Sequence, residues 1–114
     1  MVQEAITQLP ADFRAALEVV PIRVCDRPTL EQLKSVELDE EDLLLGLYEG
    51  VPLTLRSVND GPRVPDQISL FREDLEDACD VPQELREQVR ITLFHELGHY
   101  FGFDEEQLDK LGYG

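Results

Sequence analysis

The chain has 114 residues, of which 42% are hydrophobic, and its 25 acidic residues against 10 basic ones give a net charge of −15 at pH 7. This length and hydrophobic content predict a single domain, residues 1–114, with one core. Phosphate backbones and anionic membrane surfaces attract clustered Lys and Arg, so the acidic charge excludes nucleic acid and membrane as expected partners.

The sequence contains no targeting signal and no cysteine motif. No apolar run approaches the roughly 18 residues of a membrane span, and the first residues lack the basic and apolar regions of a signal peptide. We therefore expect a cytoplasmic protein. Cys25 and Cys79 form no CxxC pair, which favours two reduced thiols without a metal or redox role.

The first two predicted elements are a helix over residues 11–20 and a strand over 22–25. Apolar residues recur at helical spacing from Ala11 to Val20, and Pro21 ends the pattern. The next four residues alternate in character, as in a strand with one buried face.

A capping box begins the next predicted helix. Thr29 is followed three residues later by Gln32, and at this spacing each side chain bonds the other residue's backbone N–H. The sequence therefore predicts a short helix that carries Leu30 and Leu33.

Two further strands are predicted on either side of a turn-rich loop. The apolar run 43–48 is bounded by acidic residues and by Gly50, and the run 67–72 is also strand-like. Residues 58–65 lie between them and contain Asn, Gly and two Pro, which are typical of turns.

One long helix is predicted over residues 81–101. Pro82 suits a first helical turn, and Gly102 suits a left-handed stop. Gly98 inside the pattern costs about 1 kcal/mol relative to Ala, which indicates that another backbone or a substrate approaches the helix there. An apolar stripe with a spacing of four residues runs along the helix: Leu85, Val89, Leu93 and Leu97.

The last two turns of this helix contain the sequence His95-Glu96-Leu97-Gly98-His99. Positions four apart on a helix point nearly the same way, so both imidazoles reach one metal ion at about 2.0–2.1 Å. Glu96 then lies beside the open coordination position, where a water binds. The pattern predicts His95 and His99 as metal ligands and Glu96 as the base that takes a proton from this water.

Two acids compete for the position of third ligand. Asp104 is followed three residues later by Gln107, which resembles a capping box that opens a final helix over 104–111 and occupies the Asp104 carboxylate. Glu105 is then free to turn back toward the histidines, so we favour Glu105 over Asp104. Two His, one carboxylate and an open position form an established catalytic zinc site.

The run from His95 to Glu105 resembles the HExxHxxGxx-acid signature of small bacterial zincin-like metallopeptidases. In that signature the third ligand follows the glycine by three residues. The resemblance implies a zinc-dependent peptidase in which His95, His99 and Glu105 bind Zn²⁺ and Glu96 is the catalytic base. It extends more faintly to two upstream segments, residues 44–52 and 68–72.

The predicted order is helix, strand, helix, strand, strand, helix, helix. This order favours an α+β fold with a small sheet packed against the helix of the histidine motif. The resemblance implies the same zincin-like layout, with a small mixed sheet whose edge strand holds an extended peptide or protein substrate by strand addition. Both 43–48 and 67–72 are candidates for that edge strand.

Peptide hydrolysis often needs a further donor for the developing oxyanion. Because the chain has no third histidine, the candidates are Tyr48, Arg72, Tyr100 and Tyr113. Such side chains commonly pack along their stems, so we assign none of the four to catalysis.

Two alternatives to a peptidase remain. A chain this short has little left for substrate subsites, which favours a non-catalytic metal-binding domain that acts as a protein-interaction module; Glu96 and the lack of a visible fourth ligand argue against it. The spacing of His95, His99 and Asp104 is loosely similar to the HxxxHxxGxDH motif of bacterial rRNA-processing endoribonucleases. That motif ends in a histidine where this chain has Glu105, and the net charge of −15 opposes RNA binding.

Overall fold

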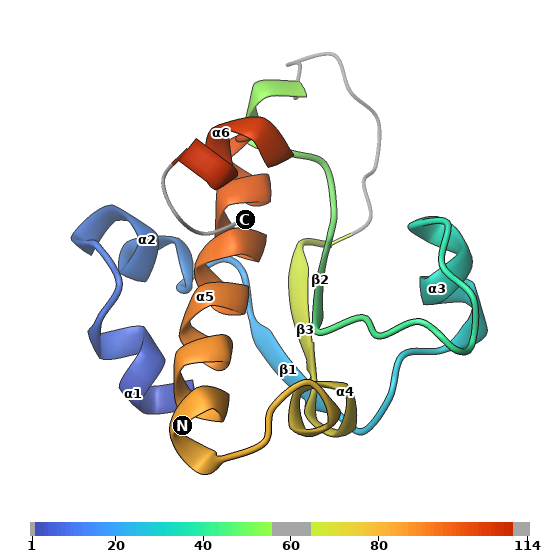
Figure 1. The fold of residues 1–114 in the computed structure, drawn as a ribbon. Helices are drawn as coiled ribbons and strands as arrows, with labels where there is room; N and C mark the ends of the chain where they lie inside the picture. Colours follow the sequence, from blue (N-terminus) through green and yellow to red (C-terminus); the bar gives the residue numbers. More distant parts are fainter. Residues whose placement is uncertain (1, 56–64, 111–114) are drawn as a thin grey trace.

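The computed structural model describes residues 2–55 and 65–110 and has an α+β fold (Figure 1). The helices are α1 Val2–Thr7, α2 Ala11–Ala16, α3 Leu30–Ser35, α4 Arg72–Asp77, α5 Pro82–Phe101 and α6 Glu105–Lys110. The strands are β1 Ile22–Cys25, β2 Gly46–Glu49 and β3 Gln67–Phe71, and a 3-10 turn, η1, spans Leu53–Leu55. Within these ranges, none of the helices has the length and apolar character that crossing a membrane requires.

In the described part of the chain, the strands form one mixed sheet in the order β1-β3-β2. β1 runs parallel to β3, with Ile22 opposite Ile68, and β2 runs antiparallel to β3, with Gly46 opposite Leu70. The prediction of 67–72 as a possible edge strand is therefore wrong, because β3 is paired on both sides. β2 lies at an edge of this sheet.

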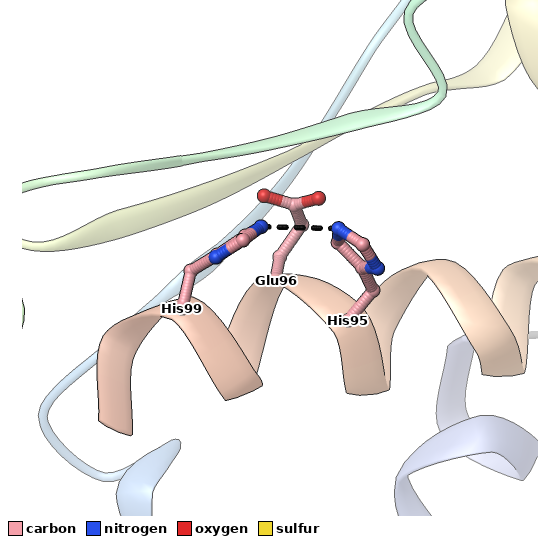
Figure 2. A group of neighbouring side chains, drawn as sticks. All are labelled: His95, Glu96 and His99. Atoms are coloured by element: carbon pink, nitrogen blue, oxygen red, sulfur yellow. Dashed lines mark hydrogen bonds between the residues drawn. The ribbon is translucent and has the colours of Figure 1, made fainter. Parts of the chain in front are cut away.

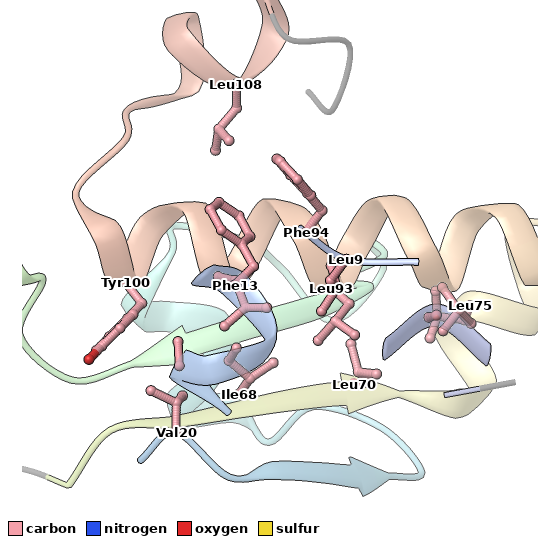
Figure 3. Packing of buried hydrophobic residues seen from close by; sticks show 14 residues of the cluster. Leu9, Phe13, Val20, Ile68, Leu70, Leu75, Leu93, Phe94, Tyr100 and Leu108 are labelled. Carbon is pink, nitrogen blue, oxygen red and sulfur yellow. The ribbon is translucent and has the colours of Figure 1, made fainter. Parts of the chain in front are cut away.

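Helix α5 is the centre of the fold. It packs on β2 and β3, and α1 and α2 pack on another side of it (Figure 1). Burial of each large apolar side chain contributes about 1.5–3 kcal/mol, so this core fixes the histidine motif on the sheet. The predicted stripe is confirmed, with Val89, Leu93 and Leu97 buried and Leu85 packed against them. Other core residues, several of them labelled in Figure 3, are Leu9, Phe13, Val20, Ile68, Leu70, Leu75, Phe94, Tyr100 and Leu108.

Helix α5 begins and ends where the sequence signals predict. Pro82 is its first residue, where the missing N–H of proline breaks no intrahelical bond. Gly102 ends it with a φ of 96°, in the left-handed region that glycine enters without steric cost. The N–H of Gly102 donates to the carbonyl of His99 (3.0 Å) and the N–H of Phe103 donates to that of Gly98 (2.9 Å), which are the two bonds of a Schellman motif.

The capping box predicted for α3 is confirmed. The N–H of Gln32 donates to Thr29 Oγ1 (3.1 Å), and the N–H of Thr29 donates to Gln32 Oε1 (2.9 Å). Gln32 Nε2 also donates to Glu49 Oε1 at 3.0 Å, which ties α3 to the end of β2.

Several boundaries differ from the predictions, and helices α1 and α4 were not predicted. α2 ends at Ala16 rather than Val20, because two β-branched residues precede Pro21 and the residue before a proline disfavours the helical region. β2 begins later than predicted, at Gly46. The predicted loop 58–65 lies, apart from its last residue, outside the described residues.

Candidate metal centre

His95 and His99 lie one helical turn apart on α5 and point the same way (Figure 2). Their Nε2 atoms are 3.0 Å apart. The intervening Leu97 is fully buried in the core and fixes this part of the helix. Both imidazole nitrogens are therefore held by a single rigid element.

The turn after α5 reverses the chain and brings Glu105 back to the two histidines. The Glu105 carboxylate lies 3.2 Å from His95 Nε2 and 3.0 Å from His99 Nε2. Asp104 instead caps α6: its Oδ1 accepts from the N–H of Gln107 (2.8 Å), and its own N–H donates to Gln107 Oε1 (2.9 Å). The predicted capping box is confirmed, and of the two competing acids Glu105 is the one beside the histidines.

Helix α6 packs on α5 at Gly98. A Cβ added to Gly98 would lie 2.5 Å from Leu108 Cδ2, and Leu108 is fully buried. The sequence suggested the approach of a backbone or a substrate at this glycine. The structure shows that the glycine admits a side chain of α6 instead.

A backbone carbonyl orients the second imidazole. His99 Nδ1 lies 3.1 Å from the carbonyl oxygen of Phe103. Because a carbonyl oxygen only accepts, this contact requires a proton on Nδ1, and the tautomer of imidazole that has it keeps its lone pair on Nε2 for a metal. Bonds of this kind fix the ring of a metal-binding histidine. Sequence reasoning missed this contact, since a backbone carbonyl has no signature in residue type.

Glu96 lies between the two histidines in sequence, but its carboxylate turns toward β2 (Figure 2). The residue is 8% exposed, and its Oε1 accepts a hydrogen bond from the N–H of Tyr48 at 2.8 Å. Burial raises the pKa of the Glu96 carboxyl above its ordinary value, whereas the imidazoles of His99 and His95 and the Tyr48 N–H act to lower it. A carboxyl whose pKa is raised is suited to accept and return a proton.

Comparison with known proteins identifies the family. Residues 17–114 match the family model described as zincin-like metallopeptidase. The chain belongs to this family. The match spans the sheet, α5 and α6, so the zincin-like α+β fold predicted from the sequence is confirmed. No curated protein matches the chain.

The side chains of this zincin-like chain fit the zinc ion that the family typically binds. Zinc prefers His nitrogen and carboxylate oxygen, and a tetrahedral ion with bonds of about 2.0–2.1 Å separates its ligand atoms by about 3.3 Å. The donor atoms of His95, His99 and Glu105 are 3.0 to 3.2 Å apart, close to that spacing. Glu96 also groups with the histidines within 4.8 Å, but its Oε1 is engaged by Tyr48.

A cleft of about 490 Å³ opens at the zincin-like site, between α5 and the edge strand β2. The candidate donors and Glu96 line the cleft, together with Gly46 and Tyr48 of β2. Among the described residues that line the cleft, there is no Lys or Arg. Its remaining wall is largely apolar and includes Val36, Leu38, Leu44, Leu47 and Pro52.

The pairing of β2 with β3 decides which backbone groups of β2 face the cleft edge. The N–H of Phe71 donates to the carbonyl of Leu45 at 3.0 Å, so these two residues form a hydrogen-bonded pair of the antiparallel ladder. Hydrogen-bonded pairs alternate along such a ladder. Gly46 and Tyr48 therefore point their N–H and carbonyl groups away from β3.

By the same alternation the N–H of Leu44 also points away from β3, and two of these three N–H groups are bonded within the protein. The N–H of Leu44, just before β2, donates to Asp74 Oδ2 at 3.0 Å, and that of Tyr48 donates to Glu96. No partner for the N–H of Gly46 lies among the described residues. Sequence reasoning missed the roles of Asp74 and Tyr48 because both depend on backbone groups of a distant strand.

The structure places the four candidate oxyanion donors in different settings. Tyr48 lines the cleft, but its hydroxyl donates to Asp66 Oδ1 at 2.6 Å. Tyr100 is buried, with its ring edge-on to that of Tyr48. Arg72 begins α4, where it pairs with two acids, and Tyr113 lies outside the described residues.

Proposed function

We propose that the chain is a zinc-dependent peptidase in which His95, His99 and Glu105 hold the ion and Glu96 is the general base. The observation that carries this proposal is the convergence of three donors from two helices beside a buried carboxylate, in a cleft next to an edge strand. Structural zinc sites normally close their shell with four protein ligands, whereas catalytic sites keep one position open. Three donors with a carboxylate next to them match the catalytic type.

The residues of the chain divide the chemistry between them. When bound, the zinc ion supplies a Lewis acid that polarises a carbonyl and lowers the pKa of a water to about 7. Glu96 accepts the proton from that water and returns it to the leaving amine. The Tyr48 N–H holds Oε1 of Glu96, which leaves Oε2 to carry the proton.

The substrate that we propose is an extended peptide or an unfolded protein segment that lies along β2. Strand addition joins backbone groups of the peptide to those of an edge strand. In β2, the outward N–H and carbonyl of Gly46 are positioned to pair with one residue of such a peptide. Nucleic acid and membrane surfaces stay excluded from the proposal, because no Lys or Arg lies among the described residues of the cleft.

The test combines metal content with cleavage. Mass spectrometry of protein purified without chelators should find about one zinc per chain. An unstructured, casein-like substrate should be cleaved, and a chelator should stop the cleavage until zinc is restored. Glu96→Gln is the matched control, because glutamine keeps an acceptor for the Tyr48 N–H but is no base. This variant should bind zinc like the wild type and lose activity by at least about 100-fold.

The other outcomes are equally informative. Cleavage by the Glu96→Gln protein at the wild-type rate would contradict the assigned base. One bound zinc without cleavage of any peptide would favour the non-catalytic interaction module. Failure to bind zinc at all would overturn the donor assignment.

A further inference from the structure

We infer that the packing of Leu108 on Gly98 sets the zinc affinity of the site, because this contact holds Glu105 beside the two histidines. The inference rests on the proposed function, in which Glu105 is the third zinc ligand. Neither Gly98 nor Leu108 carries a donor atom for zinc. Both are therefore positioning residues.

The fold holds the three candidate donors in place to different degrees. His95 and His99 belong to α5, a helix of 20 residues whose Leu93 and Leu97 are fully buried in the core. Glu105 is the first residue of α6, which has six residues, and its side chain is 69% exposed. Among the described residues, the polar side-chain contacts of Glu105 are those with the two histidines. Its position therefore depends on how α6 is held.

Among the side chains of α6 that the structure describes, Leu108 is the one buried in the core. It is fully buried, and Figure 3 shows it extending from α6 toward α5. A Cβ on Gly98 would lie 2.5 Å from its Cδ2, 3.3 Å from its Cδ1 and 3.4 Å from its Cγ. Leu108 thus fills the space that a side chain at position 98 would occupy.

The positions of Leu108 and Glu105 are linked because both residues belong to α6. They are three residues apart on a helix, a spacing that places them on neighbouring positions of its surface. A methyl group at position 98 that displaces Leu108 therefore also displaces Glu105 from His95 and His99. Alanine is, however, a better helix former than glycine, so the same methyl group strengthens α5 itself. In the zinc-free protein this helix gain of about 1 kcal/mol offsets part of the cost of crowding the buried Leu108.

The experiment measures zinc affinity by competition with a chelator for the wild type, Gly98→Ala, Glu105→Ala and the double variant. Gly98→Ala should weaken zinc binding about 10- to 100-fold, the effect typical of groups that orient a ligand. Its melting temperature without zinc should fall only a little, because the helix gain offsets part of the cost of crowding Leu108. In the Glu105→Ala background, Gly98→Ala should have no further effect, because the two changes remove the same contact.

The matched control is Glu106→Ala. Glu106 is the next acid of α6 and is exposed, and it forms an ion pair with Lys110 at 3.6 Å. This variant should bind zinc with wild-type affinity. Leu108→Ala is a second test that removes the anchor instead of crowding it, and it should weaken binding at least about 10-fold.

Two results would overturn the inference and leave the proposed function intact. The first is wild-type affinity in both Gly98→Ala and Leu108→Ala while Glu105→Ala binds zinc weakly. The second is an equal effect of Gly98→Ala with and without Glu105, since the effect would then not pass through that carboxylate. Undiminished affinity in Glu105→Ala would overturn the third ligand and this inference with it.

Discussion

The two helices that carry the candidate donors differ in how they are stabilised. α5 has 20 residues and is packed by the sheet on one side and by α1 and α2 on another. α6 has six residues and a capping box at its start, and of its described side chains Leu108 lies in the core. The site therefore has a preformed half and a half that depends on docking. Docking of α6 on α5 and metal binding are coupled, and such a coupling is reciprocal. If docking of α6 strengthens metal binding by a given free energy, a bound metal strengthens the docking of α6 by the same amount.

The largest expected loss of zinc affinity comes from a substitution in α5, the preformed half of the site. His99→Ala removes a donor of α5 and should lower zinc affinity by at least about 100-fold, more than the loss of an orienting contact. Peptide cleavage should disappear with it. Isothermal titration with zinc measures the first effect, and an unchanged circular dichroism spectrum controls for folding. Retention of one zinc at wild-type affinity would show that α5 does not supply the donors.

The anchoring of α5 is tested by Leu97→Ala. Leu97 is fully buried, so its truncation should lower the free energy of unfolding by about 2–5 kcal/mol, through lost burial and the cavity left behind. Urea denaturation of the zinc-free protein measures this change. Leu85→Ala, at a half-buried position of the same stripe, is the control and should cost less. Equal losses at the two positions would contradict the central role of this part of α5.

Two substitutions of Asp104 test how the stability of α6 affects zinc binding. Asp104→Ala removes the cap of α6 and should cost about 1 kcal/mol of helix stability, with a modest loss of zinc affinity. Asp104→Asn keeps an acceptor for the Gln107 N–H and should bind zinc nearly as well as the wild type. Chelator competition compares the two variants. If both lost affinity equally and strongly, Asp104 and not Glu105 would be the carboxylate ligand.

The smallest expected effect is a change in stability with pH, caused by the buried carboxylate of Glu96 on α5. Because burial raises the pKa of Glu96, the folded protein holds that proton more tightly than the unfolded chain. The tighter binding of this proton stabilises the folded protein at low pH. That contribution is lost as the pH rises from about 4.3, the ordinary pKa of Glu, through the raised pKa of Glu96 in the folded state. Zinc-free Glu96→Gln should be more stable than the wild type above this window and not below it. Urea denaturation across pH measures the difference, and a less stable variant at neutral pH would contradict the cost of burial.

The contrast between the two helices also explains what the sequence could predict. The limits of α5 depend on local signals, Pro82 and Gly102, and its buried face depends on a period of four residues. The capping role of Asp104 is equally local, because capping chemistry involves residues three apart. These features need no knowledge of the rest of the chain.

Features that depend on distant partners could not be predicted. The order of the strands, and hence the edge position of β2, is set by pairing between segments far apart in sequence. The bond from the Tyr48 N–H to Glu96 uses a backbone group that every residue but proline has. α4 was missed because it has six residues and no side-chain cap, so local propensity gives no signal for it.

The outward N–H groups around β2 also bear on how the protein avoids aggregation. An uncovered strand edge is a template for pairing with a second copy, and repeated pairing leads to fibres. Here the carboxylates of Asp74 and Glu96 already occupy the N–H groups of Leu44 and Tyr48, which leaves that of Gly46 between them. A neighbouring copy would gain few of the backbone bonds that drive sheet growth. The edge of β2 can thus pair with one short peptide at Gly46, but it offers too few free N–H groups for a sheet to grow from copy to copy.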